Sequence, residues 1–203
     1  MKRMHLYLFT LLLTLLAGCA SQPPSPEVDR AQGDWEHQLG RIEALDRWTL
    51  TGKIGLRSPQ QSRSANLDWV QQDTGYRMLI TGPFGVGRNV LTGEQGGITL
   101  ENGDGRFSAA TPEDLMEQRM GWSLPISSLD HWVRGLPDPR SPSQVKIDAQ
   151  GFPQAITQDG WNIEYRQWSY AAGYWLPGRL RMSYGDLIAT LVVTQWQPNQ
   201  TGS

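Results

Sequence analysis

The sequence has few of the residues that build metal centres and disulfide frameworks. It contains one cysteine, Cys19, and three histidines among 203 residues. A single thiol cannot form an internal disulfide, and thiolate or histidine-rich metal sites need several ligands. The sequence also has no Walker-type phosphate loop. We therefore expect neither a metal nor a cofactor.

The chain also lacks a basic surplus and a membrane-spanning run. Its 18 basic residues face 20 acidic ones, so we expect no nucleic-acid partner. The N-terminal apolar run, from Leu6 to Leu16, is too short to cross a bilayer. Lys2 and Arg3 precede this run, and Leu-Ala-Gly-Cys19 closes it. This order of charged, apolar and small residues is typical of an export signal.

The closing tetrapeptide resembles the lipobox of bacterial lipoproteins. The resemblance implies cleavage before Cys19 and acylation of its thiol; the alternative is a plain secretory signal followed by a chance cysteine. We expect a signal peptide at 1–18, an acylated cysteine with a proline-rich flexible tether at 19–26, and one domain at 27–203. Enterobacterial lipoproteins held in the inner membrane tend to carry aspartate where this chain has Ala20. By that resemblance the protein is anchored to the outer membrane and faces the periplasm.

Removal of the signal peptide makes the chain more acidic. Loss of Lys2 and Arg3 leaves 16 basic residues against 20 acidic ones. This balance argues against polybasic adhesion to anionic lipid.

Three segments have the pattern of helices. Apolar residues recur three or four apart over 28–45, which predicts an amphipathic helix of about five turns. Thr111 is followed by proline and two acids, as at a helix start, and this helix runs to about residue 120. A third helix is expected over 127–134, with Gly135 as its stop.

The rest of the chain alternates with a period of two, which is typical of strands with one apolar face. We expect strands near 48–56, 65–69, 76–80, 87–92, 97–101, 106–109, 145–147, 155–157, 161–165, 180–184 and 187–193. Glycine-rich turns between them predict an antiparallel meander. A sheet of ten or eleven strands must curl to bury its apolar face. The fold class is therefore mainly β: an open, incomplete antiparallel barrel, with an N-terminal helix and short helices forming a lid over a hydrophobic cavity.

Aromatic residues dominate the apolar face of this barrel. The chain has nine tryptophans, and several fall in phase with the apolar side of their strands. The residues that we expect to line the cavity are Trp48, Trp69, Met78, Ile80, Trp132, Trp161 and Tyr165. A small barrel lined in this way can hold an apolar ligand. The alternative is that these side chains simply fill the core.

A glycine-rich turn follows the third expected strand. It reads Gly82-Pro83-Phe84-Gly85-Val86-Gly87, and a turn of this composition cannot easily fold Phe84 and Val86 back into the core. Exposed apolar side chains at a loop tip indicate contact with a partner or a membrane. We expect Pro83, Phe84 and Val86 to form such a tip; the alternative is a phenylalanine tucked under its own loop.

Several motifs occur together in a fixed order. They are the lipobox, an amphipathic N-terminal helix, Asp68-Trp69-Val70-Gln71-Gln72, Tyr76-Arg77-Met78-Leu79-Ile80, the Gly-Pro-Phe-Gly turn, Leu124-Pro125-Ile126, and Trp132-Val133-Arg134-Gly135-Leu136-Pro137. No single motif is diagnostic, but the ordered set resembles the LolB family of outer-membrane lipoprotein receptors over about residues 6–198.

The resemblance carries functional expectations. It implies a receptor that accepts acylated lipoproteins from the periplasmic carrier LolA and inserts them into the inner leaflet of the outer membrane, without catalysis or ATP. The partners would be LolA, the acyl chains of the cargo and outer-membrane phospholipid, and the receptor would be a monomer. By the same resemblance Trp35, Trp69, Trp132 and Trp161 match family tryptophans. The family carries a leucine in the protruding turn where this chain has Phe84.

The sequence also permits two other functions, a hydrolase and a scaffold. A hydrolase could recruit Ser127 or Ser128 with Asp130 and His131, but these residues are adjacent on one short helix and no Gly-x-Ser-x-Gly elbow is present. We therefore expect no enzyme. The second is a tethered scaffold or assembly lipoprotein with a filled barrel. A continuous apolar cavity would favour transfer, and a solid core would favour the scaffold.

Overall fold

A computed structural model describes Arg30 and residues 34–120 and 125–198. Eleven strands form one antiparallel sheet, in the spatial order β6-β5-β4-β3-β2-β1-β11-β10-β9-β8-β7. The strands are β1 (Arg47–Arg57), β2 (Ser62–Gln72), β3 (Gly75–Thr81), β4 (Asn89–Glu94), β5 (Gly97–Asn102), β6 (Gly105–Ala109), β7 (Ser143–Ile147), β8 (Pro153–Gln158), β9 (Trp161–Ala171), β10 (Tyr174–Tyr184) and β11 (Leu187–Pro198). Each of the eleven expected strands is present. Because β6 and β7 do not pair, the barrel is open, as predicted.

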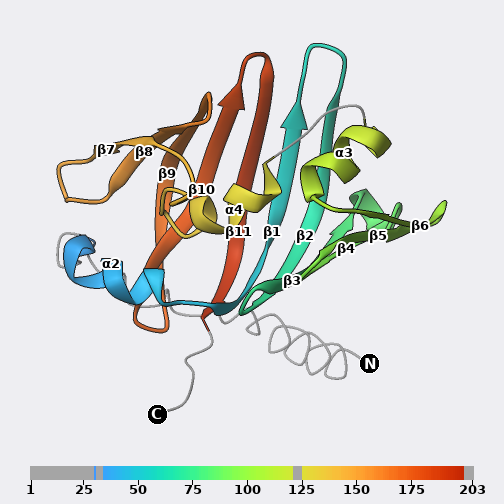
Figure 1. The fold of residues 1–203 in the computed structure, drawn as a ribbon. Coiled ribbons are helices and arrows are strands. Elements are labelled where there is room, and N and C mark those ends of the chain that lie inside the picture. The colour runs from blue at the N-terminus through green and yellow to red at the C-terminus, as the bar shows by residue number, and fades with distance from the viewer. Residues whose placement is uncertain (1–29, 31–33, 121–124, 199–203) are drawn as a thin grey trace, which may run out of the picture.

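The sheet curls around the helices. Helix α3 (Pro112–Met120) and helix α4 (Ile126–Val133) lie across its concave face, while α2 (Trp35–Glu43) packs beside β10 near one end (Figure 1). The described residues contain no helix with both the length and the apolar character needed to span a membrane.

The first helix is shorter than the sequence pattern predicted. Asp34 adopts an extended backbone and its side chain accepts a hydrogen bond from the backbone N–H of His37, so α2 begins at Trp35. The helix ends at Glu43, and Leu45 is buried beyond it. Past its C-terminal end the apolar spacing continued because Leu45 also faces the core. Residues 28, 29 and 31–33 of the expected helix, with Cys19, the signal peptide and the tether, lie outside the described residues.

Capping residues predicted the start of α3 and the end of α4, although α4 begins and ends one residue earlier than expected. The Thr111 hydroxyl accepts a hydrogen bond from the backbone N–H of Asp114 at 3.1 Å, which fixes the start of α3. Gly135 follows α4 with φ of 85°. A Cβ at Gly135 would lie 2.7 Å from the ring of Trp168 and 3.0 Å from that of Trp35. Glycine therefore both ends the helix and lets two tryptophans close over the turn.

One hydrophobic core occupies the concave side. The inward faces of β1, β2 and β11 are in register, because Leu50 lies opposite Trp69 on one side and Trp196 on the other. All three side chains are buried. The two edge strands, β6 and β7, do not pair with each other. Helices α3 and α4, which lie between them in the sequence, cover the core where a complete barrel would have further strands.

Candidate functional site

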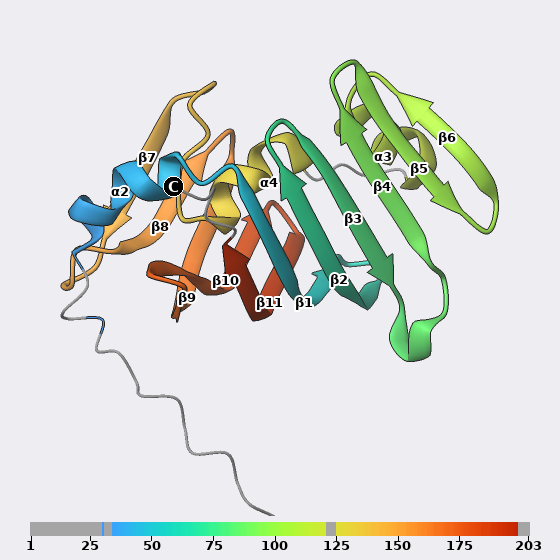
Figure 2. The same ribbon diagram turned by 90° about the horizontal axis from the view of Figure 1, so that it is seen from below.

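The turn between β3 and β4 projects from the sheet, on the side away from the helices (Figure 2). A short 3₁₀ segment, η2 (Pro83–Gly85), forms its tip. The backbone N–H of Gly82 donates to the carbonyl of Val86 at 2.8 Å, and the N–H of Gly85 donates to the carbonyl of Gly82 at 3.1 Å. The turn is therefore closed by its own backbone and needs no support from the core.

Phe84 is fully exposed at this tip, and Val86 is also exposed. The backbone of Phe84 has φ of 60° and ψ of 19°, in the left-handed region. An L-residue other than glycine, asparagine or aspartate is uncommon there, because its Cβ approaches the following carbonyl. This conformation turns the phenyl ring outward. The alternative of a ring tucked under its own loop is wrong.

The aromatic residues expected to line a cavity pack against one another. Trp48 and Trp69 have ring centroids 4.8 Å apart, and Trp132 and Trp161 have centroids 6.1 Å apart. The side chains of Trp48, Trp69, Met78, Trp132, Trp161 and Tyr165 are buried, and Ile80 is half-buried against the same core. In this conformation they belong to one packed cluster.

A pocket of about 750 Å³ lies farther along the same concave face. It is lined by the tip of the β1–β2 hairpin, the start of β11 and the last turn of α3; its side chains include Leu56, Arg63, Asn89, Arg119 and Leu187. Leu56 and Arg63 are cross-strand neighbours, and by strand alternation they share the inner face with Leu50 and Trp69. The seven expected cavity residues do not line this pocket.

Two polar groups of the buried aromatic residues are satisfied by hydrogen bonds. The Trp132 indole N–H donates to Oε1 of Gln158 at 2.8 Å, and the Tyr165 hydroxyl donates to the carbonyl of Trp132 at 2.9 Å. Burial raises the pKa of Tyr165 well above its ordinary value, so it stays a neutral donor. The indole N–H of Trp48 is buried without a hydrogen-bond partner among the described residues.

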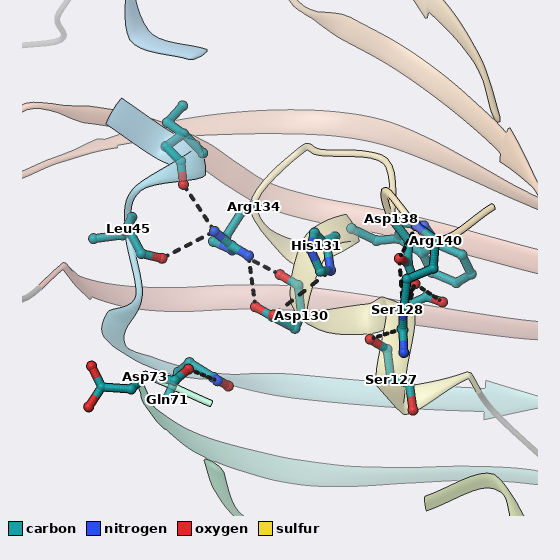
Figure 3. Close-up of polar contacts among 12 residues, drawn as sticks. Leu45, Gln71, Asp73, Ser127, Ser128, Asp130, His131, Arg134, Asp138 and Arg140 are labelled. Carbon is teal, nitrogen blue, oxygen red and sulfur yellow. Dashed lines mark hydrogen bonds and ion pairs between the residues drawn. The ribbon is translucent and has the colours of Figure 1, made fainter. Parts of the chain in front are cut away.

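Arg134 joins α4 to the end of α2 (Figure 3). Its Nη1 donates to the carbonyls of Ile42 and Leu45 at 3.0 and 3.1 Å. Its Nε donates to the carbonyl of Asp130, and its Nη2 forms an ion pair with that residue's carboxylate at 3.1 Å. The guanidinium therefore supplies donors to two carbonyls at a helix C-terminus, of which that of Ile42 also accepts from the backbone N–H of Leu45 at 3.2 Å.

A second polar cluster holds the other end of α4. The buried Asp138 carboxylate accepts hydrogen bonds from Ser128 at 2.7 Å and from Arg140. Burial alone would raise the pKa of Asp138, but the hydrogen bonds and charge of Arg140, helped by Ser128, hold it well below its ordinary value. Glu113 of α3 accepts from the backbone and hydroxyl of Ser127 at 3.0 Å. These contacts couple α3, α4 and the following loop.

The same contacts bear on the hydrolase alternative. The Ser127 and Ser128 hydroxyls are held by Glu113 and Asp138, whereas His131 Nδ1 has no hydrogen-bond partner among the described residues and lies 3.8 Å from Asp130. Burial lowers the pKa of His131, partly offset by Asp130. In the hydrolase alternative His131 would be the base for the serine nucleophile, but both serine hydroxyls donate to carboxylates instead. The described part of the chain also contains no cluster of three metal-ligating side chains.

The half-barrel architecture occurs in solved structures. The crystal structure of a LolA-superfamily protein from Nitrosomonas europaea has a TM-score of 0.54 and 8% identity over 82% of this chain and 94% of that one. A DUF1329-family protein from Desulfovibrio piger has a TM-score of 0.53 and 5% identity over 87% and 96% of the two chains. At such identities the likeness defines the class of fold alone: an open, curved antiparallel sheet with helices on its concave face.

Sequence comparison then gives the family. The pattern of the family described as outer membrane lipoprotein LolB matches residues 46–196. An outer-membrane lipoprotein LolB of Chromohalobacter salexigens is 58% identical over 95% of this chain and 90% of its own length. That of Pseudomonas paraeruginosa is 44% identical over 98% and 99%. The chain belongs to the LolB family, which indicates a role in lipoprotein localization at the outer membrane.

Proposed function

We propose that this protein accepts acylated lipoproteins from the periplasmic carrier LolA and passes them into the inner leaflet of the outer membrane. The observation that carries the proposal is the exposed Phe84, held outward on a turn that closes itself and joins two strands of the half-barrel. Family membership supplies the cargo class and the carrier. The proposal includes cleavage before Cys19, acylation of its thiol, and anchoring on the periplasmic side through the 19–26 tether.

The energetics of acyl chains explain why such a receptor needs no ATP. Each methylene moved from water to an apolar site gains about 0.8 kcal/mol, so cargo needs protection until it reaches the bilayer. A preference of about 1.4 kcal/mol at each hand-over moves about tenfold more cargo forward. Cargo then moves from carrier to receptor to membrane without ATP if each apolar site binds the acyl chains more favourably than the one before it.

The cavity for the acyl chains would form by displacement of α3 and α4. The 750 Å³ pocket at the end of the concave face is the entrance in this proposal, because Leu56 and Leu187 continue the inner apolar face toward the packed aromatic cluster. Separation of the helices would add the expected lining residues, Trp69 and Trp161 among them, to this space.

Transfer from LolA tests the proposal. The Cys19→Ala protein, which carries no acyl chain of its own, is mixed with LolA bearing a labelled lipoprotein, and the label is followed by co-purification. We expect the label to move to this protein, because the binding site lies in the barrel rather than in the anchor. Label that stays on LolA would contradict the receptor role.

One observation favours the alternative of a tethered scaffold. The expected cavity residues are packed into a solid cluster, as a barrel without cargo would be. The same transfer experiment separates the two functions, since a scaffold takes no label. We also expect a monomer, which sedimentation of the Cys19→Ala protein would check.

A further inference from the structure

Charge is divided unequally between the helices and the strands β1 and β7–β11. Helices α2, α3 and α4 together contain six acidic and two basic residues. Strands β1 and β7–β11 contain seven basic residues and one acidic residue, Glu164. The acidic net charge of the sequence, which argued against adhesion to anionic lipid, therefore conceals a basic side.

The register of the strands directs this basic charge outward. Lys53 of β1 and Arg179 of β10 both lie opposite Val192 of β11. Their neighbours along the chain, Gly52 and Leu180, are buried on the inner side of the sheet. Arg181, Arg166 and Lys146 face the same way, because they surround Glu164 and its outward neighbours. We call Lys53, Lys146, Arg166, Arg179 and Arg181 the convex basic face.

Most of these charges are not neutralised by a neighbour. Glu164 forms ion pairs with Arg166 and with Arg181. Lys53, Lys146 and Arg179 are exposed and form no ion pair with any described residue. Unpaired cations gathered on one side of an acidic protein give that side a positive potential, which attracts anionic partners.

The protruding turn lies on the side of the sheet away from the acidic helices, as the convex basic face does (Figure 2). Phe84 is its tip, and the exposed Arg88 follows it. An apolar tip beside basic charge matches a bilayer surface, in which anionic headgroups lie over hydrocarbon.

We infer that the convex basic face binds the anionic phospholipid surface of the membrane, and so orients the receptor with Phe84 toward the bilayer and its acidic helices away from it. This inference rests on the proposed function for the identity of the membrane step. It adds a second membrane contact, electrostatic in kind, that neither the anchor nor the turn supplies.

Vesicle binding by the Cys19→Ala protein tests the inference without the acyl anchor. We expect sedimentation with vesicles of phosphatidylethanolamine and phosphatidylglycerol at about 0.1 M salt, and loss of that binding at about 1 M salt, where screening shortens the range of the charges. Phosphatidylcholine vesicles should bind far less protein. Equal binding to both kinds of vesicle, or binding to neither, would overturn the inference.

A pair of matched variants locates the surface. Lys53→Gln with Arg179→Gln removes two outward charges and should lower partitioning into anionic vesicles about tenfold or more, because each basic residue near such a surface contributes about fivefold. The control, Arg63→Gln with Arg119→Gln, removes the same charge from the concave pocket and should change partitioning less than about twofold. An equal loss of partitioning in the two double variants would contradict a role for the convex basic face, because net charge alone would then determine binding.

The outcome is separable from that of the proposed function. Charge-dependent vesicle binding together with failure to accept cargo from LolA would contradict the receptor role and leave the convex basic face in place. Cargo acceptance without preference for anionic vesicles would support the receptor role and contradict binding by the convex basic face.

Discussion

At the scale of single residues, Phe84 combines two properties that a folded chain ordinarily avoids. Its ring is fully exposed, and its backbone is in the left-handed region. Strain of this kind costs about 1–2 kcal/mol and persists where the surrounding structure requires it. Because the turn is closed by hydrogen bonds on either side of Phe84, the strain is stored locally and the ring is displayed without any core contact.

Replacement of Phe84 by asparagine should therefore stabilise the fold. Asparagine tolerates the left-handed conformation, and no buried contact is lost, so we expect the free energy of unfolding to rise by about 0.5–1 kcal/mol. Urea denaturation of both proteins measures the difference. A clear loss of stability would show that the ring packs in the folded protein.

Asp138 predicts a pH dependence of stability. Its pKa is depressed in the folded protein, so its contribution is fully present above the unfolded value of about 3.9 and is lost as pH falls below it. We expect Asp138→Asn to lower the free energy of unfolding by about 2 kcal/mol at neutral pH, and the difference from the wild type to shrink below about pH 4. A difference that stays constant across this range would contradict the role of the ionised carboxylate.

At the scale of elements, the helices are held to one another by polar contacts as well as by the core. Arg134 reaches from the end of α4 to two carbonyls at the end of α2, and Gln38 of α2 accepts a hydrogen bond from the backbone N–H of Trp175 in β10 at 2.9 Å. Glu113 links α3 to the start of α4. Movement of α3 and α4 to admit cargo would have to preserve or exchange these contacts.

Arg134→Met tests the connection between α4 and α2. The methionine keeps much of the apolar stem but removes the guanidinium hydrogen bonds to the carbonyls of Ile42 and Leu45 and the ion pair with Asp130. We therefore expect a loss of about 2–4 kcal/mol in the free energy of unfolding. Arg41→Met is a matched control, because the Arg41 guanidinium makes an exposed 3.3 Å contact with the carbonyl of Gly173. Equal losses in the two variants would contradict a special role for Arg134.

The elements were predictable where local patterns decide them. Alternating apolar residues gave all eleven strands, and Thr111 and Gly135 marked helix ends through their caps. The start of α2 was missed because apolar spacing alone ignores Asp34 as a cap. Strand β9 runs on to Ala171 and pairs with the start of β10; this part was missed because Trp175, Leu176 and Pro177 are buried in succession and do not alternate.

The candidate site was less predictable than the fold. The exposed turn followed from its glycines. The hydrogen bonds of Arg134, and those between Asp138 and Gln158, were not identified, because the partners lie up to 92 residues apart in the sequence. The pocket at the hairpin tips was missed for the same reason. The convex basic face was not predicted, because the net charge of the sequence does not show on which side of the sheet each charged residue lies.

At the scale of the whole molecule, the half-barrel separates three surfaces. The concave face holds the apolar core and the pocket, and the acidic helices cover that face. The outward basic side chains of the strands and the Phe84 turn lie on the convex side. In the proposed function, acceptance and release would therefore use different parts of one protein. A change at the tip should then affect one step and spare the other.

The most direct test measures both steps in one assay for Phe84→Glu. Labelled lipoprotein is moved from LolA to the receptor and then to vesicles, with Phe84→Leu as the apolar control. We expect acceptance from LolA to change less than about twofold, and release into vesicles to fall at least about tenfold, because the charged tip loses the apolar transfer energy of the ring. Phe84→Leu should behave like the wild type. Equal loss of both steps, or no loss in either, would contradict the account.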